Sequence, residues 1–325
     1  MNKEQLIKEI IKDVVKYDDQ GYALYFRHKK DELKSCYIDY PGDGFNTNFR
    51  LASVSKQFIA MAIIDLVKEG KLTFDTIVRN IFNELPEYFD NITIRNLLNH
   101  TSGIYDYEDM EHTDLQVHDD DIITFLKTTD KTYFEVSSKY QYSNTAYVLL
   151  GLIIKKVSGK EIGDFIKENV FEKANMQDSI VNYEPYTQIN NRAYGHIREN
   201  GKKVLKDQYW CSATIGDGGL YSNINDLRNW IKYLINNHQF LKDNMFSPNI
   251  IDGYNTEYGM GMRIIKHNDN VIYYHCGSTI GTHTIILFSI DLDLECIFLT
   301  NNDDCETSLI KDNILKIIDN YGWNK

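Results

Sequence analysis

The chain has 325 residues, of which 42% are hydrophobic, and it carries 47 acidic side chains against 35 basic ones. This length and apolar content allow a substantial core, in one large domain or in two closely packed lobes. The acidic excess, without any dense basic stripe, argues against a nucleic-acid-binding protein.

The N-terminus and the cysteines bear on where the protein acts. Residues 1–5 lead into a charged segment rather than an apolar signal sequence, and no apolar run is long enough to span a bilayer. The five cysteines are odd in number and lack the close spacing of a zinc or redox site. Reduced thiols in a cytoplasm are the simplest interpretation, with an exported form trimmed of its signal as the alternative. We expect no metal and no cofactor.

The N-terminal half predicts a hairpin followed by buried helices. Residues 3–16 place their apolar side chains on one stripe, as in an amphipathic helix. Residues 21–27 and 34–40 predict two strands of a hairpin. Residues 54–67 are apolar nearly all round and end at Gly70, which predicts a buried helix with a glycine cap. Further helices are expected at 94–98, 145–157 and 227–234.

The C-terminal part predicts an antiparallel meander and a final helix. Strand-like segments separated by short polar turns cover 258–265, 271–275, 282–290 and 294–300, and a second amphipathic stripe covers 309–318. The predicted fold class is α+β, with an antiparallel sheet flanked by N- and C-terminal helices and an inserted, mainly helical lobe. We expect residues 1–50 and 205–325 to form the sheet lobe, residues 51–204 the helical lobe, and the active site to lie in the cleft between them.

Ser53 and Lys56 open the buried helix and form the first candidate catalytic pair. Side chains three positions apart share one helix face. The helix N-terminus favours negative charge that develops on Ser53, and burial lowers a lysine pKa, so Lys56 can act as a base. The same spacing recurs at Ser308 and Lys311, which we interpret as solvated surface because that helix is amphipathic.

The tripeptide Tyr142-Ser143-Asn144 lies on a loop that enters a helix. The Tyr142 phenol could relay a proton, and the Asn144 amide could hold a substrate amide. An identical tripeptide at residues 221–223 also precedes a helix. The pattern by itself therefore does not separate catalysis from helix capping.

The third group, His275-Cys276-Gly277, ends an apolar strand and occurs once in the chain. A glycine at a strand end allows close approach of another backbone or of a ligand. Strand alternation predicts that Cys276 lies on the opposite face of the sheet from His275. We interpret Cys276 as a packing residue.

In this order the three groups resemble the penicillin-recognising serine hydrolases, in the branch that joins class C β-lactamases, DD-carboxypeptidases and related esterases. Residues 97–103 are similar to the family's LLxHTSG block, residues 218–222 to its GGLYS block, and residues 258–262 to its YGxGW strand, with Met262 in place of Trp. The resemblance covers most of the chain and implies a β-lactamase/transpeptidase-like fold. We expect His100, within the first block, to be structural rather than catalytic.

The resemblance also implies chemical roles in acyl transfer. Ser53 would be the acylated nucleophile, Lys56 the amine that helps to deprotonate it, and Tyr142 the proton shuttle to the leaving group. Whether Lys56 or Tyr142 is the principal base stays open, because relatives divide this role differently.

Substrate binding is implied for four further positions. Asn144 would hold the substrate amide, and His275 stands where many relatives carry the lysine of a Lys-Thr-Gly triplet. Gly277 follows in the same strand. The backbone N–H of Ser278 would join that of Ser53 in the oxyanion hole, which needs two converging donors.

Residues 106–121 carry eight acidic side chains and no lysine or arginine. We interpret this segment as a solvated surface loop. If it rims the cleft, its field would disfavour anionic substrates, and neutralising Asp119, Asp120 and Asp121 would raise activity on carboxylated ones. His112 and His118 lie nearby, but their spacing does not predict a metal site.

The expected function is that of a serine hydrolase that forms an acyl-enzyme on Ser53 with a small ester, amide or D-amino-acid peptide. One alternative is a β-lactamase or penicillin-binding DD-carboxypeptidase, which His275 disfavours because a neutral histidine binds a carboxylate weakly. The other is a catalytically degenerate ligand sensor, which would not need Ser53, Lys56 and Tyr142 together. The expected partner is a small-molecule substrate, with no nucleic acid, no membrane span and no obligatory protein partner.

Overall fold

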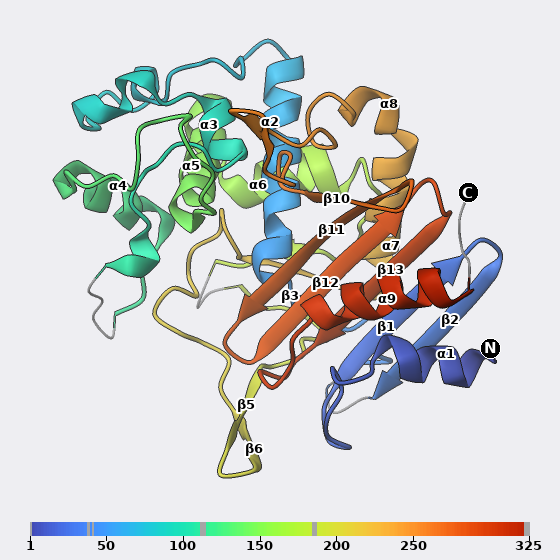
Figure 1. Cartoon of the computed structure of the whole chain (residues 1–325). Helices are drawn as coiled ribbons and strands as arrows, with labels where there is room; N and C mark the ends of the chain where they lie inside the picture. Colours follow the sequence, from blue (N-terminus) through green and yellow to red (C-terminus); the bar gives the residue numbers. More distant parts are fainter. Residues whose placement is uncertain (1, 38–39, 41, 111–114, 184–186, 322–325) are drawn as a thin grey trace.

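A six-stranded antiparallel sheet forms the framework of the molecule (Figure 1). The computed structural model describes residues 2–321 apart from 38–39, 41, 111–114 and 184–186. The strand order is β10-β11-β12-β13-β1-β2, so early and late strands share one sheet, as predicted. These strands are β1 (Tyr22–His28), β2 (Asp31–Tyr37), β10 (Arg263–His267), β11 (Asn270–Thr279), β12 (Thr282–Ser289) and β13 (Leu294–Thr300). Part of the predicted strand 34–40 lies outside the described residues.

The central strands are apolar on both faces because helices cover both sides of the sheet. In β1, Ala23 and Tyr25 belong to the larger core, which the strand shares with the inserted helices. The intervening Leu24 and Phe26 belong to a second core beneath the terminal helices. The period of two along a strand produces this division.

Two terminal helices, α1 (Lys3–Ile10) and α9 (Ser308–Tyr321), pack against each other over one face of the sheet (Figure 1). α1 is shorter than the predicted 3–16. The backbone turns at Asp13, whose φ is +62°, and the Asn313 amide donates hydrogen bonds to the carbonyls of Ile10 and Lys12. A side chain from α9 thus satisfies carbonyl groups that the end of α1 leaves free.

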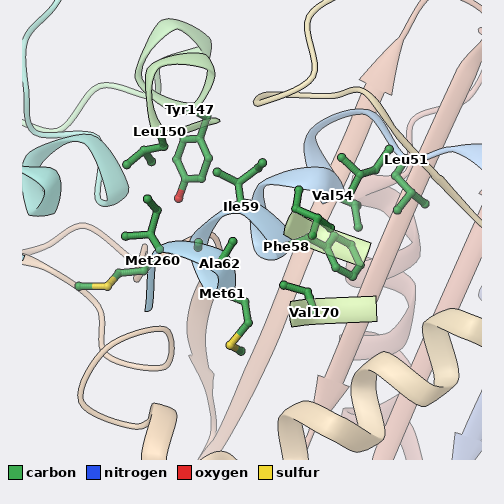
Figure 2. Close-up of a cluster of buried hydrophobic side chains, with 14 of the residues drawn as sticks. Leu51, Val54, Phe58, Ile59, Met61, Ala62, Tyr147, Leu150, Val170 and Met260 are labelled. Atoms are coloured by element: carbon green, nitrogen blue, oxygen red, sulfur yellow. The ribbon is translucent and has the colours of Figure 1, made fainter. Parts of the chain in front are cut away.

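The other face is covered by α7 (Ile224–Asn236), followed by α8 (His238–Leu241), and by the inserted helices. Helix α2 lies at the centre of the larger core, where Phe58, Ile59 and Met61 pack among side chains from other elements (Figure 2). It ends before Gly70, whose φ of +71° fits the predicted glycine cap. The inserted helices are α2 (Lys56–Lys68), α3 (Ile94–Leu98), α4 (Asp119–Thr128), α5 (Asn144–Ser158) and α6 (Ile162–Ile166).

The predicted strand 258–265 begins only at Arg263, because the preceding residues pack against the start of α2. At Gly261, where φ is +75°, an added Cβ would lie 2.8 Å from the carbonyl oxygen of Lys56. A strand conformation with a side chain does not fit there. The YGMGM segment therefore supports the site instead of extending the sheet.

Three small sheets complete the fold, and one of them supports Ser53. Its central strand, formed by the GGLYS block, is held to the Ser53 turn by hydrogen bonds from Leu51 N to Leu220 O (2.8 Å) and from Leu220 N to Ser55 Oγ (3.2 Å). No helix in the described part of the chain is long and apolar enough to cross a membrane. The strands of the small sheets are β3 (Phe49–Arg50), β7 (Leu220–Ser222) and β4 (Ile180–Val181); β5 (His196–Glu199) and β6 (Lys202–Leu205); and β8 (Ile250–Ile251) and β9 (Tyr254–Asn255).

Candidate active site

Ser53 lies in a single 3₁₀ turn (Ala52–Ser55) that leads directly into α2. The preceding residue, Ala52, has a φ of +47°, a left-handed conformation that is costly for a residue with a Cβ. Ser53 itself is half-buried and therefore accessible, whereas Val54 and Ser55 are buried. The strained turn thus presents one hydroxyl at the end of a buried helix.

Lys56, the first residue of α2, is completely buried. Its ammonium group donates hydrogen bonds to Ser53 Oγ (3.1 Å), to Asn144 Oδ1 (2.7 Å) and to the carbonyl oxygen of Asp217 (2.8 Å). Three acceptors match the three donors of a lysine. The side chain is therefore fixed with its nitrogen beside the Ser53 hydroxyl.

Burial lowers the pKa of Lys56 to about 8, although Asp217, Glu108 and Asp106 act in the opposite direction. Desolvation disfavours the charged form of a lysine, which explains the sign of the shift. With a pKa near 8, about a tenth of the molecules carry a neutral amine at pH 7. Lys56 can therefore accept a proton from Ser53 near neutral pH.

Tyr142 lies on the loop before α5, with its ring 5.0 Å from Lys56 Nζ. Its phenol oxygen is buried and forms no hydrogen bond with another described residue. Burial raises the pKa of Tyr142, which Ser53 and Arg263 partly counteract. The phenol is therefore protonated at neutral pH and close enough to Ser53 to be influenced by its hydroxyl.

His100 holds this loop from both sides of Tyr142. Its Nδ1 accepts a hydrogen bond from Ser143 N (3.1 Å), and its carbonyl oxygen accepts one from Gln141 N (3.0 Å). The His100 ring also packs on the Tyr142 ring, with centroids 4.4 Å apart. The sequence pattern assigned His100 only a general structural role, and no local signal indicated that it contacts Tyr142.

Asn144 is the first residue of α5, and Ser143 caps that helix by accepting a hydrogen bond from Ala146 N. The Asn144 amide oxygen is bound to Lys56, and its backbone N–H donates to Asp106 Oδ2 (2.6 Å). The structure thus brings Ser53, Lys56, Tyr142 and Asn144 together from segments nearly ninety residues apart.

The third motif runs along β11, which packs against the Ser53 turn. At Gly277, an added Cβ would lie 2.1 Å from the carbonyl oxygen of Leu51, so only glycine fits. Ser278 and Ser53 line the same small cavity, of about 90 Å³. Cys276 packs on the opposite side, in the core beneath the terminal helices, as strand alternation predicted.

His275 is buried behind Tyr142 and is not among the residues that line this cavity. Its Nδ1 lies 2.8 Å from the carbonyl oxygen of Cys276, which can only accept, so Nδ1 carries the proton and Nε2 accepts from the Tyr258 hydroxyl (3.1 Å). Burial lowers the pKa of His275 well below its usual value. The side chain is therefore neutral and occupied by hydrogen bonds within the protein.

The interpretation of residues 106–121 as a solvated loop is wrong for its buried members. Asp106 binds the backbone at the start of α5, and Asp119 accepts hydrogen bonds from Ile215 N (2.8 Å) and Gly216 N (3.1 Å). Backbone N–H groups inside the fold need acceptors, which explains why these carboxylates are buried. Within this segment, the exposed Glu108 lines the cavity, whereas Glu111, His112 and Asp114 lie outside the described residues.

Known proteins resemble this chain in sequence and in fold. The chain is 31% identical over 280 residues to penicillin-binding protein 4* of Bacillus subtilis, covering 80% of this chain and 62% of that protein. It is 28% identical over 221 residues to the putative penicillin-binding protein PbpX of the same organism, covering 67% and 54%. The chain thus spans between half and two thirds of the length of these relatives.

Two solved structures share the fold. The octameric penicillin-binding protein homologue from Pyrococcus abyssi superposes with a TM-score of 0.81 at 23% identity, over 100% of this chain and 78% of that one. D-amino acid amidase from Ochrobactrum anthropi superposes with a TM-score of 0.79 at 23% identity, over 99% of both chains. These likenesses confirm the predicted fold class. A family model described as Beta-lactamase matches residues 14–318, and the chain belongs to that family.

Proposed function

We propose that this chain is a serine hydrolase that forms an acyl-enzyme on Ser53 with a small ester, amide or D-amino-acid peptide. The observation that carries the proposal is the buried Lys56, whose nitrogen lies 3.1 Å from Ser53 Oγ and whose pKa is lowered to about 8. A buried lysine with a depressed pKa beside an accessible serine is a means of activating the serine without histidine.

In the proposed acylation step, neutral Lys56 accepts the Ser53 proton while Ser53 Oγ attacks the substrate carbonyl carbon. The N–H groups of Ser53 and Ser278 stabilise the oxyanion. As the bond to the leaving group breaks, the Tyr142 phenol donates its proton to the departing nitrogen or oxygen and recovers one from Lys56. Water then attacks the ester, a proton passes to the same relay, and the acid leaves with Ser53 restored.

Lys56 is the favoured principal base in this scheme. The raised pKa of Tyr142 keeps the phenol protonated in the resting state, so Tyr142 has a proton to give and Lys56 has a site to receive one. In this scheme Asn144 holds the substrate amide, which is supported by its fixed position between Lys56 and Asp106.

A β-lactamase or DD-carboxypeptidase is the second candidate, because the curated relatives described above are named penicillin-binding proteins. His275 speaks against strong binding of a substrate carboxylate, since it is buried and neutral. The ligand-sensor alternative does not explain why a buried lysine with a lowered pKa contacts an accessible serine.

The test is acylation measured by intact mass. The protein is incubated with short-chain chromogenic esters, amino acid amides, D-alanyl dipeptides and a labelled penicillin, and the Ser53→Ala variant serves as the control. An adduct or turnover that is lost in the variant supports the hydrolase. Absence of adduct and turnover with every class would favour the sensor.

A further inference from the structure

Two carboxylates line the same cavity as Ser53, although they come from distant segments. Glu108 lies in a short 3₁₀ turn (Tyr107–Asp109) before α4, and Asp217 lies in the loop before β7. The cavity measures about 90 Å³, so any group bound by these carboxylates is close to the nucleophile. Neither carboxylate forms an ion pair with another residue that the structure describes.

Asp217 has an oxygen that lacks a donor. Its side chain is only 6% exposed, and Oδ2 accepts a hydrogen bond from the Tyr107 hydroxyl (2.8 Å). The other oxygen, Oδ1, is buried and has no hydrogen-bond partner among the described residues. Buried carboxylate oxygens normally have donors, so this one is an acceptor that a ligand can complete.

Glu108 is exposed as a residue, but its carboxyl group points to the cavity and has a raised pKa. Partial burial raises the pKa of Glu108 to about 7, and the carboxylates of Asp217 and Asp106 act in the same direction, whereas Lys56 and a hydrogen bond to Asn144 lower it. A cation placed between Glu108 and Asp217 would reduce this repulsion and supply hydrogen-bond donors to both.

Lys56 and Arg50, the cations beside this cavity, form no ion pair with either carboxylate among the described residues. The three donors of Lys56 are bound to Ser53, Asn144 and the backbone oxygen of Asp217, not to either carboxylate group. Arg50, which also lines the cavity, donates from Nη2 to the carbonyl oxygen of Ser212, and its buried Nε and Nη1 form no hydrogen bond with a described residue. When Lys56 is neutral and Glu108 is ionised, two carboxylates face one guanidinium at the cavity wall.

We propose that Glu108 and Asp217 bind the protonated α-amine of the substrate's acyl group, so that the protein prefers amides, esters or peptides of amino acids with a free amine. The proposal rests on the hydrolase function above and specifies its substrate class. An α-amine is one carbon away from the carbonyl that Ser53 attacks, which suits a small cavity containing both the nucleophile and the carboxylates. A charge-assisted hydrogen bond to each carboxylate would secure it.

A competing explanation is that these carboxylates only raise the pKa of Lys56, as both of them do. The two roles predict different kinetics. Loss of an amine-binding group reduces activity selectively on substrates with a free amine. A changed Lys56 pKa alters activity on all substrates alike and shifts the pH profile.

The experiment compares D- and L-alanine p-nitroanilides and methyl esters with their N-acetyl derivatives. The measured quantity is the ratio of kcat/KM for the free amine to kcat/KM for the N-acetyl partner. We expect a ratio of about ten to a hundred for the wild-type protein with at least one enantiomer. We expect Glu108→Gln and Asp217→Asn to lower that ratio about tenfold each.

Asp120→Asn is the matched control, because Asp120 is an exposed carboxylate in the first turn of α4 and is not part of this cavity. It should leave the ratio unchanged. A wild-type ratio of one or less, or equal losses on both substrates of a pair, would overturn the amine site. Ser53-dependent acylation by the N-acetyl esters is measured in the same assays. Because these esters lack a free amine, they test the hydrolase function independently of the amine site. The ratio of kcat/KM values for the wild-type protein is measured without any substitution, so a variant that fails to fold does not affect it.

Discussion

The same tripeptide, Tyr-Ser-Asn, occurs in two regions of the molecule and has different neighbours in each. At residues 142–144 it leads into α5, and at 221–223 it leads into α7, where Asn223 caps the helix. Tyr142 has an unpartnered, buried hydroxyl near Ser53, whereas the Tyr221 hydroxyl accepts a hydrogen bond from Arg192 (2.7 Å). The local sequence therefore specifies a helix start in both places, and the neighbours brought by the fold decide which tyrosine is available for chemistry.

Among the substitutions considered, replacing Lys56 should reduce activity most at the site that contains Tyr142. Lys56→Met keeps an unbranched side chain but removes the base, so we expect acylation of Ser53 to fall by about a thousandfold. The rate is measured as release of p-nitrophenol from a short-chain ester. Lys311→Met in the second Ser–Lys pair is the control, because Lys311 interacts with Asp312 and Ser308 with Glu306 instead of with each other. Wild-type acylation by Lys56→Met would refute the role of Lys56.

The two tyrosines allow a direct test of the comparison. Tyr142→Phe should reduce turnover about a hundredfold, because it removes the proton donor to the leaving group, with little change in the free energy of unfolding. Tyr221→Phe should leave turnover per folded molecule intact and lower the free energy of unfolding by about 1–2 kcal/mol, because a buried guanidinium loses an acceptor. Urea unfolding and ester hydrolysis are measured for both variants. If Tyr221→Phe reduced turnover and Tyr142→Phe did not, the proposed role of Tyr142 as proton donor would be contradicted.

The pH dependence of kcat/KM reports the base. The pKa of Lys56 is lowered to about 8, and the proposed mechanism requires the neutral amine, so activity should rise about tenfold per pH unit below 8 and level off above it. Glu108→Gln should move this midpoint to lower pH, since the Glu108 carboxylate raises the Lys56 pKa. A profile that is flat between pH 6 and 9 would show that Lys56 is not the titrating base.

His100 is expected to have the smallest effect of these positions. His100→Ala removes the acceptor for Ser143 N, and we expect kcat to fall by up to about tenfold while KM changes little. His100→Asn places an amide oxygen where Nδ1 was and tolerates the φ of +60°, so it should recover most of that loss. Equal kcat values for both variants would indicate that the hydrogen bond does not position Tyr142.

Much of the framework could be predicted from the chain because its elements have strong local signals. The buried helix ending at Gly70 and the meander of β11, β12 and β13 follow from apolar runs and turn residues. Element ends were less accurate where other parts of the fold intervene. α1 stops at Ile10, where Asn313 binds its carbonyls, and β10 starts late, because Gly261 packs on the backbone of Lys56.

The acidic segment shows why charge patterns mislead in isolation. Eight acidic side chains suggested a solvated surface, yet Asp106 and Asp119 are buried on backbone donors, and Glu108 lines the cavity. Hydrogen bonds to backbone N–H groups of distant segments offset the cost of burying the Asp106 and Asp119 carboxylates. The sequence around an acidic residue does not show which distant backbone N–H groups will bind it.

The sequence by itself determined the family, the α+β framework and the set of side chains with the right chemistry, because apolar periodicity and motif order are local properties. Tertiary structure alone decided which copies of repeated motifs have partners: Lys56 with Ser53 and Asn144, His100 with the Tyr142 loop, and Glu108 with Asp217 at one cavity. The reason is that pKa values, hydrogen bonds and cavities depend on burial and on neighbours from distant segments. A serine and a lysine three positions apart occur twice in this chain, and the fold buries the lysine completely in only one of these pairs, Ser53 and Lys56.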